Sequence, residues 1–181
     1  MSLTDKEIFE QFLVEETKEQ AFLMLIAKYK EKLYWHIRRM LFNHADTDDL
    51  LQDVFLKLWQ KLHLFKGNAV IYTFIYRIAT NEVIDHINKK KRKAEWSLIS
   101  DEGDYEQELI SPSFIDGDEI LRKLDATLEK LPEKQRLVFN MRYYDEMTYD
   151  QISEVLDTSV GGLKASYHHA VKKIEKYLRS D

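Results

Sequence analysis

The chain has 181 residues, of which 44% are hydrophobic and 33% charged, with only 5 glycines and 2 prolines. This composition predicts one or two helical domains rather than a turn-rich β fold. The chain contains no cysteine, which excludes a disulfide framework and a thiolate zinc site. Its first residues do not resemble a signal peptide, and no apolar run approaches the roughly 18 residues of a membrane span. We therefore expect a cytoplasmic protein without membrane insertion.

The net charge of −5 is unevenly distributed along the chain. Residues 1–93 carry a net charge of +3, residues 94–117 carry −7 and residues 118–181 carry −1. The acidity therefore comes from the middle segment. The flanking segments remain compatible with nucleic-acid binding, which depends on local basic patches rather than on total charge.

Hydrophobic periodicity predicts helices throughout the first half of the chain. They cover about residues 9–15, 19–41 and 71–90, together with a further helix that Asp46 or Thr47 is expected to cap. One face of this capped helix is apolar and is expected to be buried through Leu50, Leu51, Val54, Phe55, Leu58 and Leu62. The opposite face is acidic and polar with one leucine, which is typical either of a protein-docking surface or of an ordinary solvated face.

The helix over residues 71–90 has a side suited to nucleic acid. Opposite its apolar residues lies a set of side chains that we expect to read bases, namely Thr73, Arg77, Thr80, Asn81, Ile84 and Asn88. The basic run Lys89–Lys93 is suited to binding phosphates, although such a run is also typical of a solubilising helix end. Residues 94–117, with their acids, serines, glycines and a proline, predict a flexible linker. Its apolar patch of Trp96, Leu98 and Ile99 either packs on a domain or stays apart from both.

A compact helical unit is predicted from Asp118 onwards. Pro132 starts a helix, Thr148 caps a short one, and Ser159 caps the last helix after a turn at Asp157-Thr158. This spacing is typical of a helix-turn-helix, although a purely structural helical unit has the same pattern. The side of the last helix that faces away from its apolar stripe carries Gly162, Ala165, Ser166, His169, Lys172, Lys173 and Lys176.

Nothing in the sequence indicates catalysis or metal binding. His168 and His169 point about 100° apart on a helix and cannot chelate one ion. The acidic pairs are explained as helix-cap and turn residues, and the chain contains neither a nucleotide-binding loop nor a nucleophile motif. We therefore expect no enzyme activity, metal, cofactor or small-molecule substrate.

Two separated segments resemble bacterial sigma factors. The first is Asp49–Leu56 (DLLQDVFL), followed by Trp59, which resembles the sigma helix that binds the clamp helices of the largest RNA polymerase subunit. The second resembles the promoter −35 domain in Leu131–Arg136 (LPEKQR), Arg142-Tyr143, Thr148–Ile152 (TYDQI) and Ser159–Lys164 (SVGGLK). The resemblance covers about residues 8–93 and 118–180 and is to extracytoplasmic-function (ECF, group IV) sigma factors of the sigma-70 superfamily.

The resemblance implies an all-α fold of two small domains, sigma region 2 at 8–93 and sigma region 4 at 118–181, joined by the acidic linker at 94–117. It implies three sets of site residues. The polymerase-binding set is Asp49, Gln52, Asp53, Phe55, Leu56 and Trp59. The −10 set is Lys66, Asn68, Ala69, Arg77, Asn81, Lys89, Lys90, Lys91 and Arg92. The −35 set is Arg136, Lys164, Ser166, His169 and Lys172.

The chain departs from the family pattern at three places. Asn68 stands where Asp is common, Phe74 where Trp is common, and Ala165-Ser166 where Ser-Arg often follows the lysine. The last departure predicts weaker base readout, because a bidentate arginine–guanine contact contributes about 1–3 kcal/mol.

The function implied by the resemblance is that of an alternative sigma factor that binds core RNA polymerase, recognises −10 and −35 promoter elements and promotes strand opening. The implied partners are core RNA polymerase, promoter DNA and an anti-sigma factor. Two alternatives remain open from the residues alone, a DNA-binding regulator that uses only the helix-turn-helix and an adaptor that binds proteins but no DNA.

Overall fold

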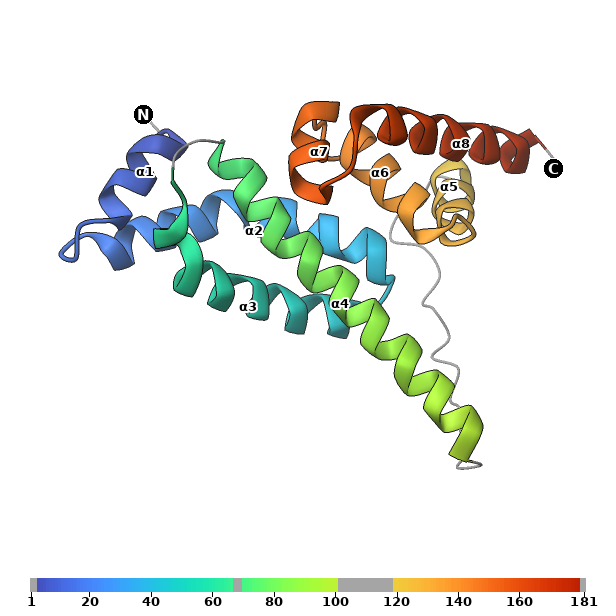
Figure 1. Cartoon of the computed structure of the whole chain (residues 1–181), viewed down its shortest axis with the longest axis horizontal. Coiled ribbons are helices and arrows are strands. Elements are labelled where there is room, and N and C mark those ends of the chain that lie inside the picture. The colour runs from blue at the N-terminus through green and yellow to red at the C-terminus, as the bar shows by residue number, and fades with distance from the viewer. Residues whose placement is uncertain (1–2, 67–69, 101–118, 180–181) are drawn as a thin grey trace. The chain divides into compact units, whose positions relative to one another are not determined.

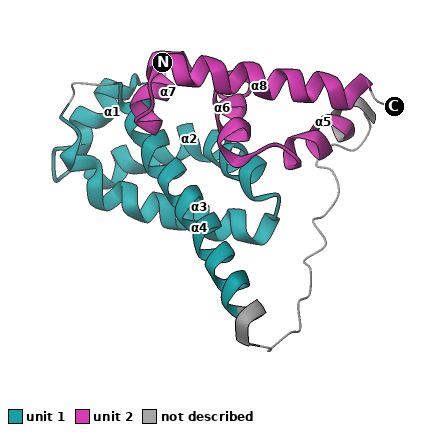
Figure 2. Cartoon of the chain, turned by 45° about the vertical axis from the view of Figure 1, so that its right-hand side comes forward, with its two compact units in different colours: residues 1–99 teal, residues 100–181 magenta. Residues whose placement is uncertain are grey.

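The computed structural model describes residues 3–66, 70–100 and 119–179, without the side chains of 97–100 and 119–122. Every regular element in these ranges is helical (Figure 1). The chain divides into two compact units, Met1–Ile99 and Ser100–Asp181 (Figure 2). The predicted all-α architecture of two small helical domains is therefore confirmed, while residues 101–117 of the expected linker lie outside the described residues.

The first unit contains α1 (Asp5–Phe12), α2 (Lys18–Leu41), α3 (His44–Lys61), the short 3₁₀ helix η1 (Leu62–Leu64) and α4 (Ile71–Ser100). α1 packs on α2, and α2 packs on α3. α1 begins before the expected Phe9 because Thr4 and Glu7 form a capping box, in which each side chain accepts a hydrogen bond from the other residue's backbone N–H. The core of the unit is formed by apolar side chains of all four α-helices.

The turn between α2 and α3 differs from expectation. Phe42 ends α2 in the left-handed conformation with φ 55°, and Asn43 caps α3 by accepting a 2.9 Å hydrogen bond from the backbone N–H of Asp46. The prediction that Asp46 or Thr47 caps this helix was therefore wrong. Thr47 is buried and its hydroxyl donates to the Asn43 carbonyl at 2.6 Å, so its side chain is committed inside the first turn.

α4 is longer than the periodicity predicted, because it continues past Lys90 to Ser100. The ten added residues contain several good helix formers, and neither glycine nor proline interrupts them before Gly103. Residues 94–100, which we expected in the linker, are therefore helical. Figure 1 shows the last turns of α4 extending past the other helices of the unit.

The second unit contains α5 (Glu119–Glu129), α6 (Glu133–Tyr143), α7 (Tyr149–Leu156) and α8 (Val160–Arg179), with α5, α6 and α7 all packed on α8. Thr148 caps α7 in a capping box with Gln151, as predicted for Thr148. Asp157 makes the turn in the left-handed conformation, and the Ser159 hydroxyl accepts from the Gly162 N–H at 3.3 Å. The predicted helix-turn-helix is therefore present as α7 and α8.

Among the helices that the structure describes, none combines the length and the apolar character that crossing a membrane requires.

Candidate functional surfaces

α3 has one buried face and one exposed face, as its periodicity predicted. Leu50, Leu51, Val54 and Leu58 are buried, and Leu62 is buried at the start of η1. The opposite face exposes Asp49, Gln52, Asp53 and Gln60, with Leu56 60% exposed in the middle of them. An exposed leucine surrounded by carboxylates and amides is complementary in character to an apolar pocket with basic groups around it.

Phe55 and Trp59 lie at the side of this face and are half-buried. The expectation that Phe55 belongs to the buried stripe was therefore wrong. The Trp59 ring packs edge-on against Phe12 of α1 and Phe22 of α2, with ring centroids 5.7 and 5.1 Å away. The Lys18 ammonium group lies 5.1 Å from the centroid of the Trp59 ring. Trp59 therefore packs α3 against α1 and α2, and only part of its ring is exposed to solvent.

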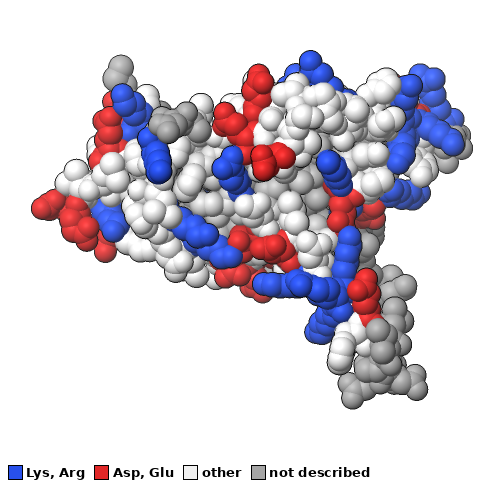
Figure 3. Space-filling view, viewed as in Figure 1, with Lys and Arg blue, Asp and Glu red and all other residues white. Residues whose placement is uncertain are grey.

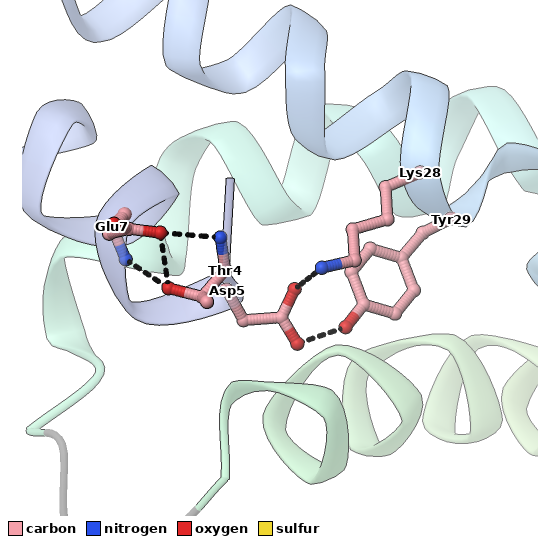
Figure 4. A network of polar contacts seen from close by, with 5 residues as sticks. All are labelled: Thr4, Asp5, Glu7, Lys28 and Tyr29. Atoms are coloured by element: carbon pink, nitrogen blue, oxygen red, sulfur yellow. Dashed lines mark hydrogen bonds and ion pairs between the residues drawn. The ribbon is translucent and has the colours of Figure 1, made fainter. Parts of the chain in front are cut away.

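α1 is held by a polar network that sequence analysis missed (Figure 4). Asp5 accepts a 2.6 Å hydrogen bond from the Tyr29 hydroxyl and forms a 2.7 Å ion pair with Lys28. Burial, together with this bond to Asp5, raises the pKa of Tyr29 above its ordinary value. The sequence did contain a signal for this helix, since Thr4 and Glu7 have the spacing of a capping box.

The predicted −10 residues before and within the first part of α4 differ in their exposure to solvent. Lys66, Arg77 and Asn81 are exposed, whereas Asn68 and Ala69 lie outside the described residues. Thr73 and Thr80, which we expected on the base-reading side, are both buried. For these two threonines the prediction was wrong.

Both threonines have specific internal partners. The Thr73 hydroxyl donates to the Val70 carbonyl at 2.7 Å, which closes the first turn of α4. The Thr80 hydroxyl lies 3.1 Å from Nε2 of the buried His36 on α2, and the His36 ring packs against Tyr76 at 5.0 Å. A helical wheel cannot show that these threonines are buried. It places a threonine on the polar side, although a threonine can be buried when its hydroxyl has a hydrogen-bond partner inside the protein.

The basic residues near the end of α4 are exposed, and Figure 3 shows Lys and Arg side chains gathered on this part of the helix. Lys90 and Arg92, which we expected to bind phosphates, also interact with other residues of the first unit. Lys90 forms a 2.5 Å ion pair with Asp46 in the first turn of α3, and Arg92 Nε donates to the Asn88 carbonyl at 3.3 Å. His86 also lies 3.5 Å from Asp46. Asp46 thus joins the start of α3 to α4.

On the second unit, Lys164, His169 and Lys172 of α8 are exposed and Ser166 is half-buried. Lys164 lies close to the first turn of α7, where its ammonium group is 5.8 Å from the Tyr149 ring centroid. The Arg142 guanidinium group lies 5.3 Å from the same ring. A cavity of about 450 Å³ adjoins this cluster and is lined by Arg142, Tyr143, Glu146, Tyr149 and Tyr167.

Arg136 is positioned differently from the other predicted −35 residues. Its side chain is 8% exposed, and one guanidinium nitrogen donates to the Glu129 carbonyl of α5 at 3.4 Å. Burial lowers the pKa of Arg136 from its ordinary value, against the opposing effect of the carboxylates of Glu133 and Glu129. Because its guanidinium group is turned into the domain, Arg136 has little surface to offer to DNA and instead joins α6 to α5.

Family comparisons agree with this division into two units. Residues 25–93 match the model of Sigma-70 region 2, and residues 121–174 match that of Sigma-70, region 4. The ECF RNA polymerase sigma factor SigW of Bacillus subtilis (strain 168) is 30% identical over 92% of this chain and 93% of its own length. The RNA polymerase sigma-H factor of Pseudomonas aeruginosa is 28% identical over 97% and 94%.

Solved structures show the same fold. The sigma factor RpoE of Bartonella quintana, in complex with the anti-sigma factor NepR, has a TM-score of 0.73 at 20% identity and covers 93% of this chain and 99% of its own. CnrH, in complex with the cytosolic domain of CnrY, has a TM-score of 0.72 at 22% identity over 98% of both chains.

The fold and the two family matches define a sigma factor of the sigma-70 type. Within that class, the chain belongs to the ECF sigma factors of RNA polymerase. The predicted class of transcription initiation factor is thereby confirmed.

Proposed function

We propose that this sigma factor docks on core RNA polymerase through the exposed face of α3. Asp49, Gln52, Asp53 and Leu56 form the contact surface, with Phe55 and Trp59 at its side. The supporting observation is the 60% exposure of Leu56 on a helix whose other face is fully packed. An exposed leucine gains on burial about 25 cal/mol for each Å² of apolar area that a partner covers, and the carboxylates around it select a basic partner.

The −10 element is bound by the first unit, at a surface that includes Lys66, Arg77 and Asn81 together with Lys89–Arg92. Asn68 and Ala69 belong to the same proposed surface through the family resemblance. The exposure of Asn81 and Arg77 supports a role in reading or positioning a strand, and the basic run supports phosphate contacts. Thr73 and Thr80 are left out, because their side chains are buried.

The −35 element is bound by α8, with its N-terminal half in the major groove. Lys164, Ser166, His169 and Lys172 are the proposed contacts, and Arg136 is left out because it is buried. No arginine is among these contacts, so base readout rests on weaker donors than the bidentate guanidinium–guanine contact. We therefore expect a large share of −35 affinity to come from phosphate contacts and to fall steeply with salt.

We infer further that an anti-sigma protein competes for the docking surface on α3. The fold that this chain shares with two sigma factors solved with partner proteins, NepR and the cytosolic domain of CnrY, supports the inference of such a partner. We also infer that the chain acts in the cytoplasm as a binding factor without catalytic activity. A stand-alone helix-turn-helix regulator would not need the exposed face of α3. An adaptor that binds no DNA would not need the basic end of α4.

The test combines purified protein, core RNA polymerase and a random double-stranded library, followed by mapping of transcript start sites. We expect starts clustered at a fixed distance downstream of a shared two-part motif. Reactions with core polymerase alone provide the control. Failure to bind core polymerase would overturn the proposal in favour of the stand-alone regulator.

A further inference from the structure

The last described turns of α4 carry a tryptophan beside a strongly basic run. Trp96 is 73% exposed, and the five residues from Lys89 to Lys93 are all basic and exposed. Lys93 and Arg92 precede Trp96 by three and four residues, so they lie one turn away on the same side of the helix. Lys89 precedes it by seven residues and lies a further turn along that side. We call Lys89, Arg92, Lys93 and Trp96 the Trp96 face.

This combination of side chains matches the chemistry of a single-stranded nucleic acid. An indole ring stacks on a base of any identity, and neighbouring cations neutralise the phosphates on either side of that base. A duplex does not offer this contact, because its bases are already stacked on one another. Strand opening by a sigma factor produces unpaired DNA, so the established function supplies such a ligand.

The helix also fixes where Trp96 stands relative to the proposed −10 surface. α4 is continuous from Ile71 to Ser100, and Trp96 follows Asn81 by 15 residues. At the helical rise this is about 22 Å along the axis, and the two positions differ by only about 60° around it. At about 3.4 Å per nucleotide, a strand needs roughly six or seven nucleotides to span that distance. One strand can therefore run along α4 from Asn81 to Trp96.

We propose that Trp96 stacks on an unpaired base of promoter DNA, while Lys89, Arg92 and Lys93 hold the adjacent phosphates. This contact rests on the proposed −10 function and extends it to Trp96 and Lys93, which lie beyond the residues of that surface. With this contact, α4 binds the opened strand at two points, near Asn81 and near Trp96.

The test measures binding of the full chain to a 20-nucleotide single strand and to the duplex of the same sequence. Trp96→Ala is expected to weaken single-strand binding about tenfold, the typical loss of one base–aromatic stack, and to change duplex binding less than about twofold. Trp96→Phe is expected to retain most of the affinity, because its ring still stacks. Leu23→Ala, at a 65% exposed leucine on α2, is the matched control and is expected to bind like the unchanged protein.

The charge component is tested by Lys93→Gln, which is expected to reduce the salt dependence of single-strand binding by about 0.7 in slope. An equal loss on single strand and duplex, no loss with Trp96→Ala, or no rescue by phenylalanine would each overturn the proposal. Tenfold tighter binding of the matching RNA would also overturn it, as would loss of core polymerase binding without loss of single-strand binding. Asn81→Ala distinguishes failure of the proposed −10 surface from failure of the Trp96 contact. If Asn81→Ala has no effect on single-strand binding while Trp96→Ala weakens it, the −10 role of Asn81 is wrong and the Trp96 contact stands.

Discussion

Lys57 of α3 and Glu82 of α4 form an ion pair that joins the helix proposed to bind polymerase to the helix proposed to bind the −10 element. Glu82 is the more buried partner, with a side chain that is 14% exposed against 40% for Lys57. The same two helices bury Leu58 and Val83 completely. The apolar core thus holds α3 and α4 in the first unit, and the ion pair adds a directional contact between them.

Replacing Glu82 by glutamine is expected to lower the free energy of unfolding of the first unit by about 0.5–1 kcal/mol. The effect is small because Lys57 is more than one-third exposed and water screens the pair. Thermal unfolding followed by circular dichroism measures it, with Glu31→Gln at an exposed site on α2 as the control. A loss of core polymerase affinity in a fully folded Glu82→Gln protein would contradict the assignment of docking to the outer face of α3.

The docking face itself is tested by Asp53→Arg combined with Leu56→Ala. We expect this double substitution to abolish core polymerase binding, because it reverses a charge and removes the exposed apolar contact. The unfolding temperature is expected to stay unchanged, since both side chains are exposed. Co-migration with core polymerase on a sizing column measures binding. Glu31→Arg makes the same change of charge on α2 and is expected to bind normally, and full affinity of the double variant would show that the face is wrongly assigned.

Arg136→Gln and Lys164→Gln form a contrasting pair in the second unit. The buried Arg136 is expected to matter for stability, with a loss of about 1–3 kcal/mol when its buried contacts are removed. The exposed Lys164 is expected to matter for −35 DNA affinity and its salt dependence, with little change in stability. Chemical unfolding and a −35 duplex titration distinguish the two effects. Weakened DNA binding by a stable Arg136→Gln protein would restore Arg136 to the DNA surface.

Features set by local sequence were predictable. The apolar stripe of α3 and the caps of α7 and α8 depend on residues within one or two turns, so their spacing in the sequence was enough. The exposed positions Asp53, Leu56 and Asn81 followed from the same periodicity. Sequence also indicated the family, because its motifs are short runs of residues that can be compared without knowing how the helices pack.

Features that depend on contacts between helices were not predictable from spacing. Thr80 looked like a base reader because its partner, His36, is 44 residues away on α2. Arg136 looked like a DNA contact because nothing in its own helix shows that it reaches the Glu129 carbonyl of α5. The cap of α3 was misassigned for a different, local reason, since the helix begins at His44 and Asn43, three residues before Asp46, caps it.

Asp46 gives the first unit a defined dependence on acid. Its partial burial favours the neutral acid and by itself raises the pKa, but the pairing with Lys90 and His86 outweighs this and holds the pKa of Asp46 below its ordinary value. A carboxyl group with a lower pKa in the folded protein stabilises the fold above its unfolded pKa of about 3.9, and this stabilisation is lost as the pH falls through the folded value.

Asp46→Asn is therefore expected to lower the free energy of unfolding by about 1 kcal/mol at neutral pH, since it removes an ion pair and a favourable charge at a helix N-terminus. The difference between Asp46→Asn and the unchanged protein is expected to shrink as the pH falls below about 4, because the unchanged protein then loses the same charge. Urea unfolding at a series of pH values measures this difference. Asp48→Asn, in the same turn but half-exposed, is the control and is expected to show a smaller difference. A difference for Asp46→Asn that persists undiminished at pH 3 would mean that its charge does not stabilise the fold.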